Sequence, residues 1–87
     1  MSSQLLHPTD LLRQMVQQMV DLPEEVRIDV HESDHTATFD IEVADTDVGK
    51  ALGRNGSHAK ALRLLFGAIY GKHGKRLHLQ VIDPNRR

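Results

Sequence analysis

Two helical patterns meet at a four-residue turn with glycine at both ends, and this segment constrains the fold more than any other part of the chain. The turn is Gly53-Arg54-Asn55-Gly56. Glycine tolerates positive φ and lacks the Cβ atom that would keep another backbone at a distance. An arginine follows the first glycine, and a helix N-terminus with outward-pointing N–H groups comes next. The sequence therefore predicts a bare, cationic turn that is suited to contact with a phosphate backbone.

The length and the absence of cysteine set the class of protein. The 87 residues predict one small domain over residues 1–84 and a loose tail at 85–87. A chain without cysteine forms no disulfide and no thiolate metal site, which is typical of a reducing compartment. We see neither a signal-peptide pattern nor an apolar run near the ~20 residues that span a bilayer. The expected location is the cytoplasm.

The charge is distributed unevenly along the chain. Residues 1–48 contain 11 acidic and two basic side chains, whereas residues 49–87 contain nine basic and one acidic. Such asymmetry favours a polyanionic partner for the second half. The alternative is that the two halves neutralise each other across the folded surface, and the net charge of -1 leaves both interpretations open.

Apolar periodicity predicts the elements and their order. Helical spacing covers residues 8–21, a short segment ending at 52, and residues 57–71, where Ala59, Leu62, Phe66 and Ile69 form a core stripe with Leu65 beside it. Period-two alternation covers residues 26–31, 37–43 and 77–81, and a polar turn at 33–35 joins the first two as a hairpin. Asp45, Thr46 and Asp47 offer cap chemistry for the short helix. The order α-β-β-α-α-β predicts a two-layer α+β domain whose helices cover one face of a three-stranded sheet.

This order, with a GxxG turn between two helices, resembles a type II KH domain, which has a mixed sheet. More narrowly, the chain is similar to the small single-domain bacterial proteins of the KhpA family. The resemblance covers nearly the whole chain and is carried by VGKALGRNG at residues 48–56, AKALR at 59–63, GKRL at 74–77 and VID at 81–83.

The resemblance implies that the chain binds single-stranded RNA in a groove beside the turn, because the GxxG loop of a KH module clamps about four nucleotides. The role implied is that of an RNA chaperone or post-transcriptional regulator. The candidate RNA-binding residues are Gly53, Arg54, Asn55, Gly56, Lys50, Ser57, His58, Lys60, Arg63, Leu52 and Ala59. Leu52 and Ala59 are expected to line the groove, and Arg54 is the strongest single candidate because it lies in the turn itself.

Each candidate also has a simpler interpretation. The two glycines, Gly53 and Gly56, are also explained as residues that end helices. The cations Lys50, Lys60 and Arg63 are equally well explained as solvated surface charges. His58 is also explained as an ordinary exposed histidine. The six histidines form no convincing ligand pattern, and no nucleophile–base pair can be argued from spacing. We therefore expect no metal site, no cofactor and no enzymatic activity.

A protein-interaction module is the competing function. The resemblance implies a homodimer or a larger KH-containing partner, and the last helix around Phe66, Ile69 and Tyr70 is a candidate surface, although a core position explains Phe66 and Ile69 as well. Single-stranded DNA remains an alternative to RNA, because no residue reveals whether a 2′-hydroxyl is read.

Overall fold

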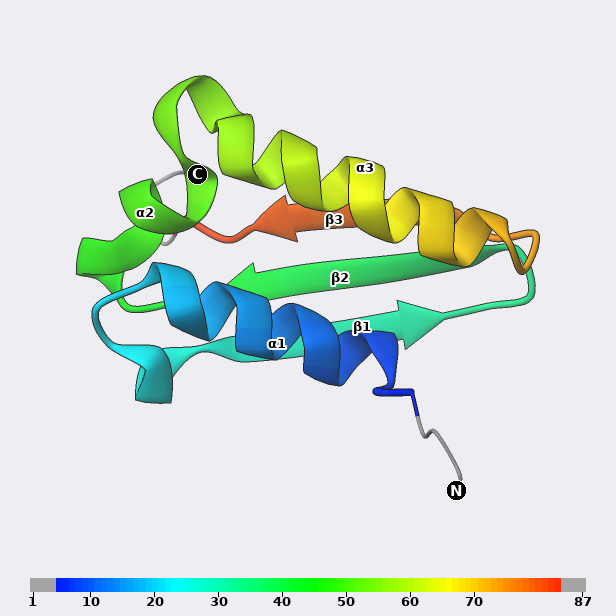
Figure 1. Cartoon of the computed structure of the whole chain (residues 1–87), viewed down its shortest axis with the longest axis horizontal. Helices are drawn as coiled ribbons and strands as arrows, with labels where there is room; N and C mark the ends of the chain where they lie inside the picture. Colours follow the sequence, from blue (N-terminus) through cyan, green and yellow to red (C-terminus); the bar gives the residue numbers. More distant parts are fainter. Residues whose placement is uncertain (1–4, 84–87) are drawn as a thin grey trace.

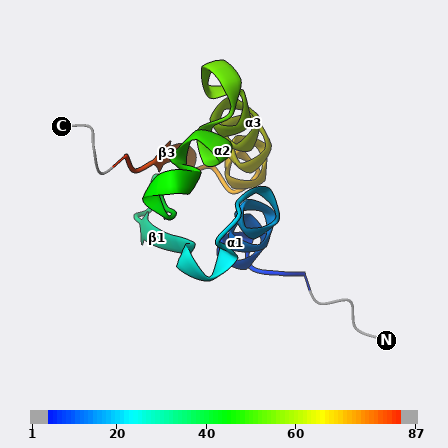
Figure 2. The same cartoon turned by 90° about the vertical axis from the view of Figure 1, so that its left-hand side faces the viewer.

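The computed structural model describes residues 5–83, and within this range the chain forms two layers (Figure 1). The helices lie on one side of the strands, as the turned view shows (Figure 2). The elements are α1 (Pro8–Met19), β1 (Arg27–Glu32), β2 (Thr36–Glu42), α2 (Val48–Leu52), α3 (Ser57–Gly71) and β3 (Arg76–Val81). This arrangement confirms the predicted α+β class and the order α-β-β-α-α-β. The domain boundary expected at residue 84 and the tail at 85–87 lie outside the described residues.

The sheet is mixed, with β2 in the centre. β1 pairs with β2 antiparallel through the predicted hairpin, and β2 pairs with β3 parallel. Ser33 closes the hairpin: its N–H donates to the Thr36 carbonyl at 2.9 Å, and the two hydroxyls are 2.8 Å apart. A parallel pair needs a crossover between its strands. Here the crossover is α2 and α3, so the GxxG turn is held above one end of the sheet.

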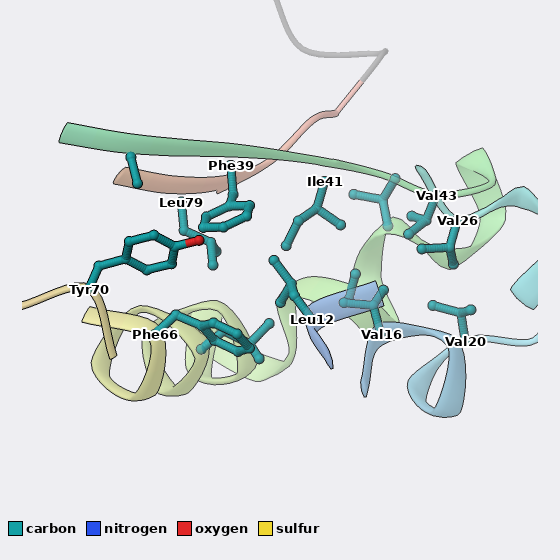
Figure 3. Close-up of a cluster of buried hydrophobic side chains, with 14 residues drawn as sticks. Leu12, Val16, Val20, Val26, Phe39, Ile41, Val43, Phe66, Tyr70 and Leu79 are labelled. Carbon is teal, nitrogen blue, oxygen red and sulfur yellow. The ribbon is translucent and has the colours of Figure 1, made fainter. Parts of the chain in front are cut away.

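The core fills the space between helices and sheet (Figure 3). Phe39 of β2 lies between two aromatic residues of α3, with ring centroids 6.4 Å from Phe66 and 5.5 Å from Tyr70. Leu12 and Val16 of α1 are fully buried beside them. Edge-to-face contacts of this kind contribute roughly 0.5–1.5 kcal/mol each beyond area burial.

Two expectations for α3 are wrong. Leu65 does not lie beside the core but is 54% exposed. The surface expected around Phe66, Ile69 and Tyr70 is absent, because Phe66 and Tyr70 are buried and Ile69 is partly buried against the core. The physical reason is helix phase: Tyr70 follows Phe66 by four residues and therefore shares its inward face. The large apolar side chains that α3 exposes are instead Leu64 and Leu65.

The end of the domain opposite the GxxG turn has its own polar contacts. Lys75 Nζ donates to Glu32 Oε2 at 2.7 Å, and this bond lowers the pKa of Glu32. The Tyr70 hydroxyl is buried without a hydrogen-bond partner, and Figure 3 shows it pointing into the core cluster. Burial raises the pKa of Tyr70, so the phenol stays neutral.

Candidate nucleic-acid interface

The short helix α2 is positioned by a buried carboxylate. Asp47 is fully buried, and its two oxygens accept N–H bonds from Asp21 at 3.2 Å and Leu22 at 2.9 Å. The sequence predicted cap chemistry for this helix from Asp45, Thr46 and Asp47. Asp47 does occupy the N-cap position, but its side chain makes no capping hydrogen bond. Asp47 instead ties the start of α2 to the loop that follows α1. A helix of five residues gains little stability from its own hydrogen bonds, so this tie fixes its place.

The turn itself combines three residues with positive φ. Gly53 has φ 77° and ψ 168°, Asn55 has φ 56° and ψ 27°, and Gly56 has φ 74° and ψ 18°. The Gly53 N–H donates to the Gly49 carbonyl at 2.9 Å and closes α2, while the Gly56 N–H donates to the Gly53 carbonyl at 3.0 Å. The bond from Gly56 to Gly53 closes a tight turn over Arg54 and Asn55, and the left-handed conformation of Asn55 and Gly56 distinguishes it from a 3₁₀ helix. The turn leads directly into α3.

The first glycine of the turn is packed against residues that flank the turn. We call Gly53, together with the flanking residues Lys50 and His58, the closed half. A Cβ atom on Gly53 would lie 2.5 Å from Cγ of the His58 ring and 2.8 Å from the His58 backbone nitrogen. The ring is fixed in this place because Nδ1 lies 2.8 Å from the Lys50 carbonyl oxygen. A carbonyl can only accept, so Nδ1 carries the proton and donates. Lys50 is engaged as well, because its Nζ lies 3.1 Å from Asp21 Oδ2.

The second part of the turn is free, and we call Arg54, Asn55 and Gly56 its open half. Arg54 and Asn55 are exposed, and a Cβ atom on Gly56 would meet nothing within 4 Å. None of the ion pairs found within residues 5–83 involves Arg54. The left-handed backbone of Asn55 and Gly56 therefore stands clear of other atoms, and a second backbone can approach it closely.

The first turns of α3 add cations and an exposed hydroxyl beside the open half. Ser57 and Lys60 are exposed, and no side chain caps the N-terminus of α3. Ala59 is different: it is buried to 1% exposure, so the expectation that it lines a groove is wrong. Ala59 is turned inward, whereas its neighbour Lys60 is exposed.

Two hollows border β3 next to this surface. The first, of about 330 Å³, lies between α2 and the end of the strand, and Leu52 lines it together with Gln80, Val81, Ile82 and Asp83. The second, of about 410 Å³, is lined by Thr38, Arg63, Leu77, His78, Leu79 and Gln80. Arg63 reaches across to the strand, where its Nε donates to the Leu79 carbonyl at 2.8 Å. Two of the predicted side chains, Leu52 and Arg63, thus face β3.

Sequence reasoning expected a sheet edge beside the groove but named no residue of β3, and it missed the packing role of His58. Nothing in the pattern of residues 77–81 distinguishes an edge strand that faces α3 from a central one, because strand order depends on pairing across the whole chain. The contact between His58 and Gly53 can be predicted only when the conformation of the turn is known.

Within residues 5–83, no helix has both the length and the apolar character needed to cross a membrane.

Comparison with known proteins gives a consistent result. The family model for the KH domain of KhpA and KhpB matches residues 9–81. The chain is 35% identical over 74 residues to the RNA-binding protein KhpA of Borreliella burgdorferi, a match that covers 85% of this chain and 90% of that protein. It is also 35% identical to the RNA-binding protein KhpA of Listeria monocytogenes and 32% identical to that of Chlamydia pneumoniae, covering 97% and 95% of them. No solved structure matches the chain. These relatives are named as RNA-binding proteins rather than as enzymes, in agreement with the expectation from the sequence.

Proposed function

This chain belongs to the KhpA/KhpB family of KH domains, and on that premise we propose that it binds single-stranded RNA through the open half of the turn and the adjoining face of α3 and β3. The observation that carries the proposal is the exposure of Arg54 and Asn55 beside Gly56, where a Cβ atom would meet nothing within 4 Å. In the cell such a domain would act in the cytoplasm as an RNA chaperone or post-transcriptional regulator.

The proposed contact with the phosphates uses backbone and charge together. Bare left-handed backbone at Asn55 and Gly56 lets a phosphate approach the N–H groups at the start of α3, where the helix dipole favours negative charge. Arg54 and Lys60 add cations on the same side, and Ser57 adds a hydroxyl donor. Lys50 is held by Asp21, so it contributes less.

Base contacts would come from the strand side. Leu52 presents an aliphatic surface to the hollow at the end of β3, and the edge of β3 presents backbone groups. The aromatic residues of the core, Phe39, Phe66 and Tyr70, are buried and offer no stacking platform. Affinity would therefore be modest and sensitive to salt. With about three phosphate contacts, log K is expected to fall with log[salt] at a slope near ~-2.

The test replaces the two exposed side chains of the turn by acids. The double variant Arg54→Asp with Asn55→Asp should bind a mixed-sequence RNA oligonucleotide at least about tenfold more weakly, because like charge meets phosphate where donors were. Fluorescence anisotropy measures the affinity, and circular dichroism verifies the fold.

A charge-matched control separates local contact from net charge. Lys72→Asp with His73→Asp changes a similar amount of charge in exposed residues beyond the other end of α3. We expect this control to retain most of the affinity. If the turn variant binds as tightly as the parent, or if both double variants lose the same amount, the proposed RNA site is wrong.

Self-association is a second candidate property, and a specific observation favours it. Leu64 and Leu65 are 76% and 54% exposed on α3. Leu65 also lines an apolar hollow of about 180 Å³ between α3 and α1, together with Met15, Met19, His58, Ala61 and Leu62. We propose that a second copy of this chain covers this surface, which we call the apolar flank of α3; a larger KH-containing protein is the alternative occupant.

Sedimentation velocity over a concentration series tests the second candidate. If the parent dimerises, Leu65→Lys should raise the dimer dissociation constant about tenfold or more, since it replaces buried apolar area by a charge. Leu22→Lys is the matched control, because Leu22 is 40% exposed but lies outside this flank. A parent that stays monomeric at high concentration rules the homodimer out.

A further inference from the structure

The free edge of β3 can be read residue by residue. The Arg76 N–H donates to the His35 carbonyl and the Ile82 N–H to the Ile41 carbonyl, both at 2.8 Å, so even-numbered residues direct their backbone groups toward β2. Successive residues of a strand direct these groups to opposite sides. The N–H and C=O groups of Leu77, Leu79 and Val81 therefore point away from the sheet, toward the side where Arg63 lies.

Arg63 changes the hydrogen-bonding character of this edge. Its Nε donates to the Leu79 carbonyl at 2.8 Å in a partly buried contact, so one of the two lone pairs of this acceptor is used. The guanidinium has five N–H donors in a fixed fork and no acceptor, and one donor is used here. In the middle of the edge, donors therefore outnumber acceptors: the Leu79 N–H and the other N–H groups of Arg63 lie beside one remaining lone pair.

A hollow large enough for a nucleobase lies at this point. It measures about 410 Å³ and is lined by Arg63, the Leu77–Leu79 stretch of β3, and Thr38 and Gln80. Leu79 is buried in the core, so it offers its main chain to the hollow. Gln80 is already engaged, since its Nε2 donates to Asp40 Oδ1 at 2.8 Å. Among the polar side chains that line the hollow, which include Thr38 and His78, Arg63 has the fork of N–H donors that can contact two base atoms at once.

We propose that this hollow is a base-selecting subsite in which Arg63 favours guanine and cytosine over adenine and uracil. The inference rests on the proposed RNA binding and deepens it. Arg63 follows Gly56 by seven residues, which is about 10 Å along α3. A nucleotide whose neighbour contacts the open half of the turn reaches the subsite without bending back.

The selection follows from the donor and acceptor pattern of the bases. An arginine fork needs two adjacent acceptors, which guanine presents as O6 and N7 and cytosine presents as O2 and N3. Adenine places its N6 amino donor beside each of its ring acceptors N1 and N7, and uracil places N3–H between its two oxygens. The adenine amino group would have to share the Leu79 carbonyl with Arg63, whose remaining donors face the same hollow.

The test uses oligouridine eight-mers with one central substitution, measured by fluorescence anisotropy. The guanine and cytosine oligonucleotides should bind about tenfold more tightly than the adenine oligonucleotide and all-uridine, as expected for one bidentate contact. Inosine keeps O6 and N7 and should retain the gain, whereas 7-deazaguanine lacks N7 and should lose most of it.

Arg63→Lys is the decisive variant because it keeps the charge and removes the fork. The guanine-to-adenine ratio should therefore fall to about one. Lys60→Ala is the matched control on the same helix: it should weaken every oligonucleotide equally and leave the ratio unchanged.

Three outcomes would count against the subsite. Equal affinity of the parent for guanine and adenine overturns it, and the parent comparison needs no variant. A guanine preference that survives Arg63→Lys overturns the role of Arg63. If no oligonucleotide binds at all, the proposed RNA binding itself fails, which is a different result from binding without selection.

Discussion

The closed half and the open half of the turn each contain one glycine, and the surroundings of the two glycines differ. Gly53 and Gly56 have nearly equal φ, 77° and 74°. The space beside Gly53 is filled by the His58 ring, and the space beside Gly56 is empty. The first glycine therefore serves the packing of the protein, and only the second leaves room for a ligand.

This difference shows that one GxxG signature contains two separate requirements. Gly53, with ψ 168°, occupies a region of backbone space that is essentially restricted to glycine. Gly56, with ψ 18°, lies in the left-handed helical region that other residues enter at modest cost. The two positions should respond differently to the same substitution.

The largest effect is expected from Gly53→Ala. Backbone strain of order 1–3 kcal/mol adds to a collision of the new methyl group with His58, so we expect a loss of about 3 kcal/mol in the free energy of unfolding. For a domain of this size such a loss is a large part of its total stability. Urea denaturation followed by circular dichroism measures it.

Gly56→Ala is the matched substitution in the open half. It should cost only about 1 kcal/mol of stability, because the methyl group enters empty space. It should nevertheless weaken RNA binding, since that space is where the phosphate backbone is proposed to approach. Equal losses of stability in the two alanine variants would remove the distinction between the halves.

A smaller effect is expected from His58→Ala. The variant loses the hydrogen bond to the Lys50 carbonyl and the ring contact with Gly53, and we expect about 1 kcal/mol of destabilisation. His73→Ala, an exposed histidine in the turn after α3, should change stability by less than about 0.5 kcal/mol.

The same contact fixes the tautomer of His58. Nδ1 must carry the proton in the neutral ring because its partner is a carbonyl oxygen. Nitrogen chemical shifts of the imidazole, measured by NMR near pH 8, identify the protonated nitrogen. A ring protonated at Nε2 instead would show that His58 is not bound to Lys50 and that the closed half is less ordered than described.

The elements were predictable from sequence because each depends on local periodicity. The alternation of Ala37, Phe39 and Ile41 identified the buried face of β2, and the pair of glycines identified the turn. Long-range contacts were not predictable in the same way. Asp47 looked like a cap for its own helix, but its partners, Asp21 and Leu22, lie 26 and 25 residues earlier in the chain.

The site was predictable only in part, for the same physical reason. Arg54 and Asn55 lie in a turn whose exposure follows from its glycines. The burial of Ala59 agrees with the core stripe predicted for α3 and excludes only its expected place in the groove, whereas Leu65, expected beside that stripe, is exposed. The bond between Arg63 and Leu79 depends on β3 being an edge strand, which no local pattern of residues 76–81 encodes.

The smallest effect is expected at Lys50, which sequence reasoning grouped with the RNA-binding residues. Its Nζ pairs with Asp21 at 3.1 Å in an exposed contact, and such pairs contribute only a few tenths of a kcal/mol. Lys50→Met should therefore change stability little and weaken RNA binding less than about twofold, whereas Arg54→Met should weaken it several-fold more.

Asp21→Asn provides the reciprocal control, because it releases Lys50 and removes an acid near the turn while leaving the backbone N–H that binds Asp47 in place. If the ion pair is what keeps Lys50 from the RNA, this variant should bind RNA about twofold more tightly than the parent. If Lys50→Met loses as much affinity as Arg54→Met, Lys50 contacts the RNA and belongs to the open half. The closed half would then consist of Gly53 and His58 alone.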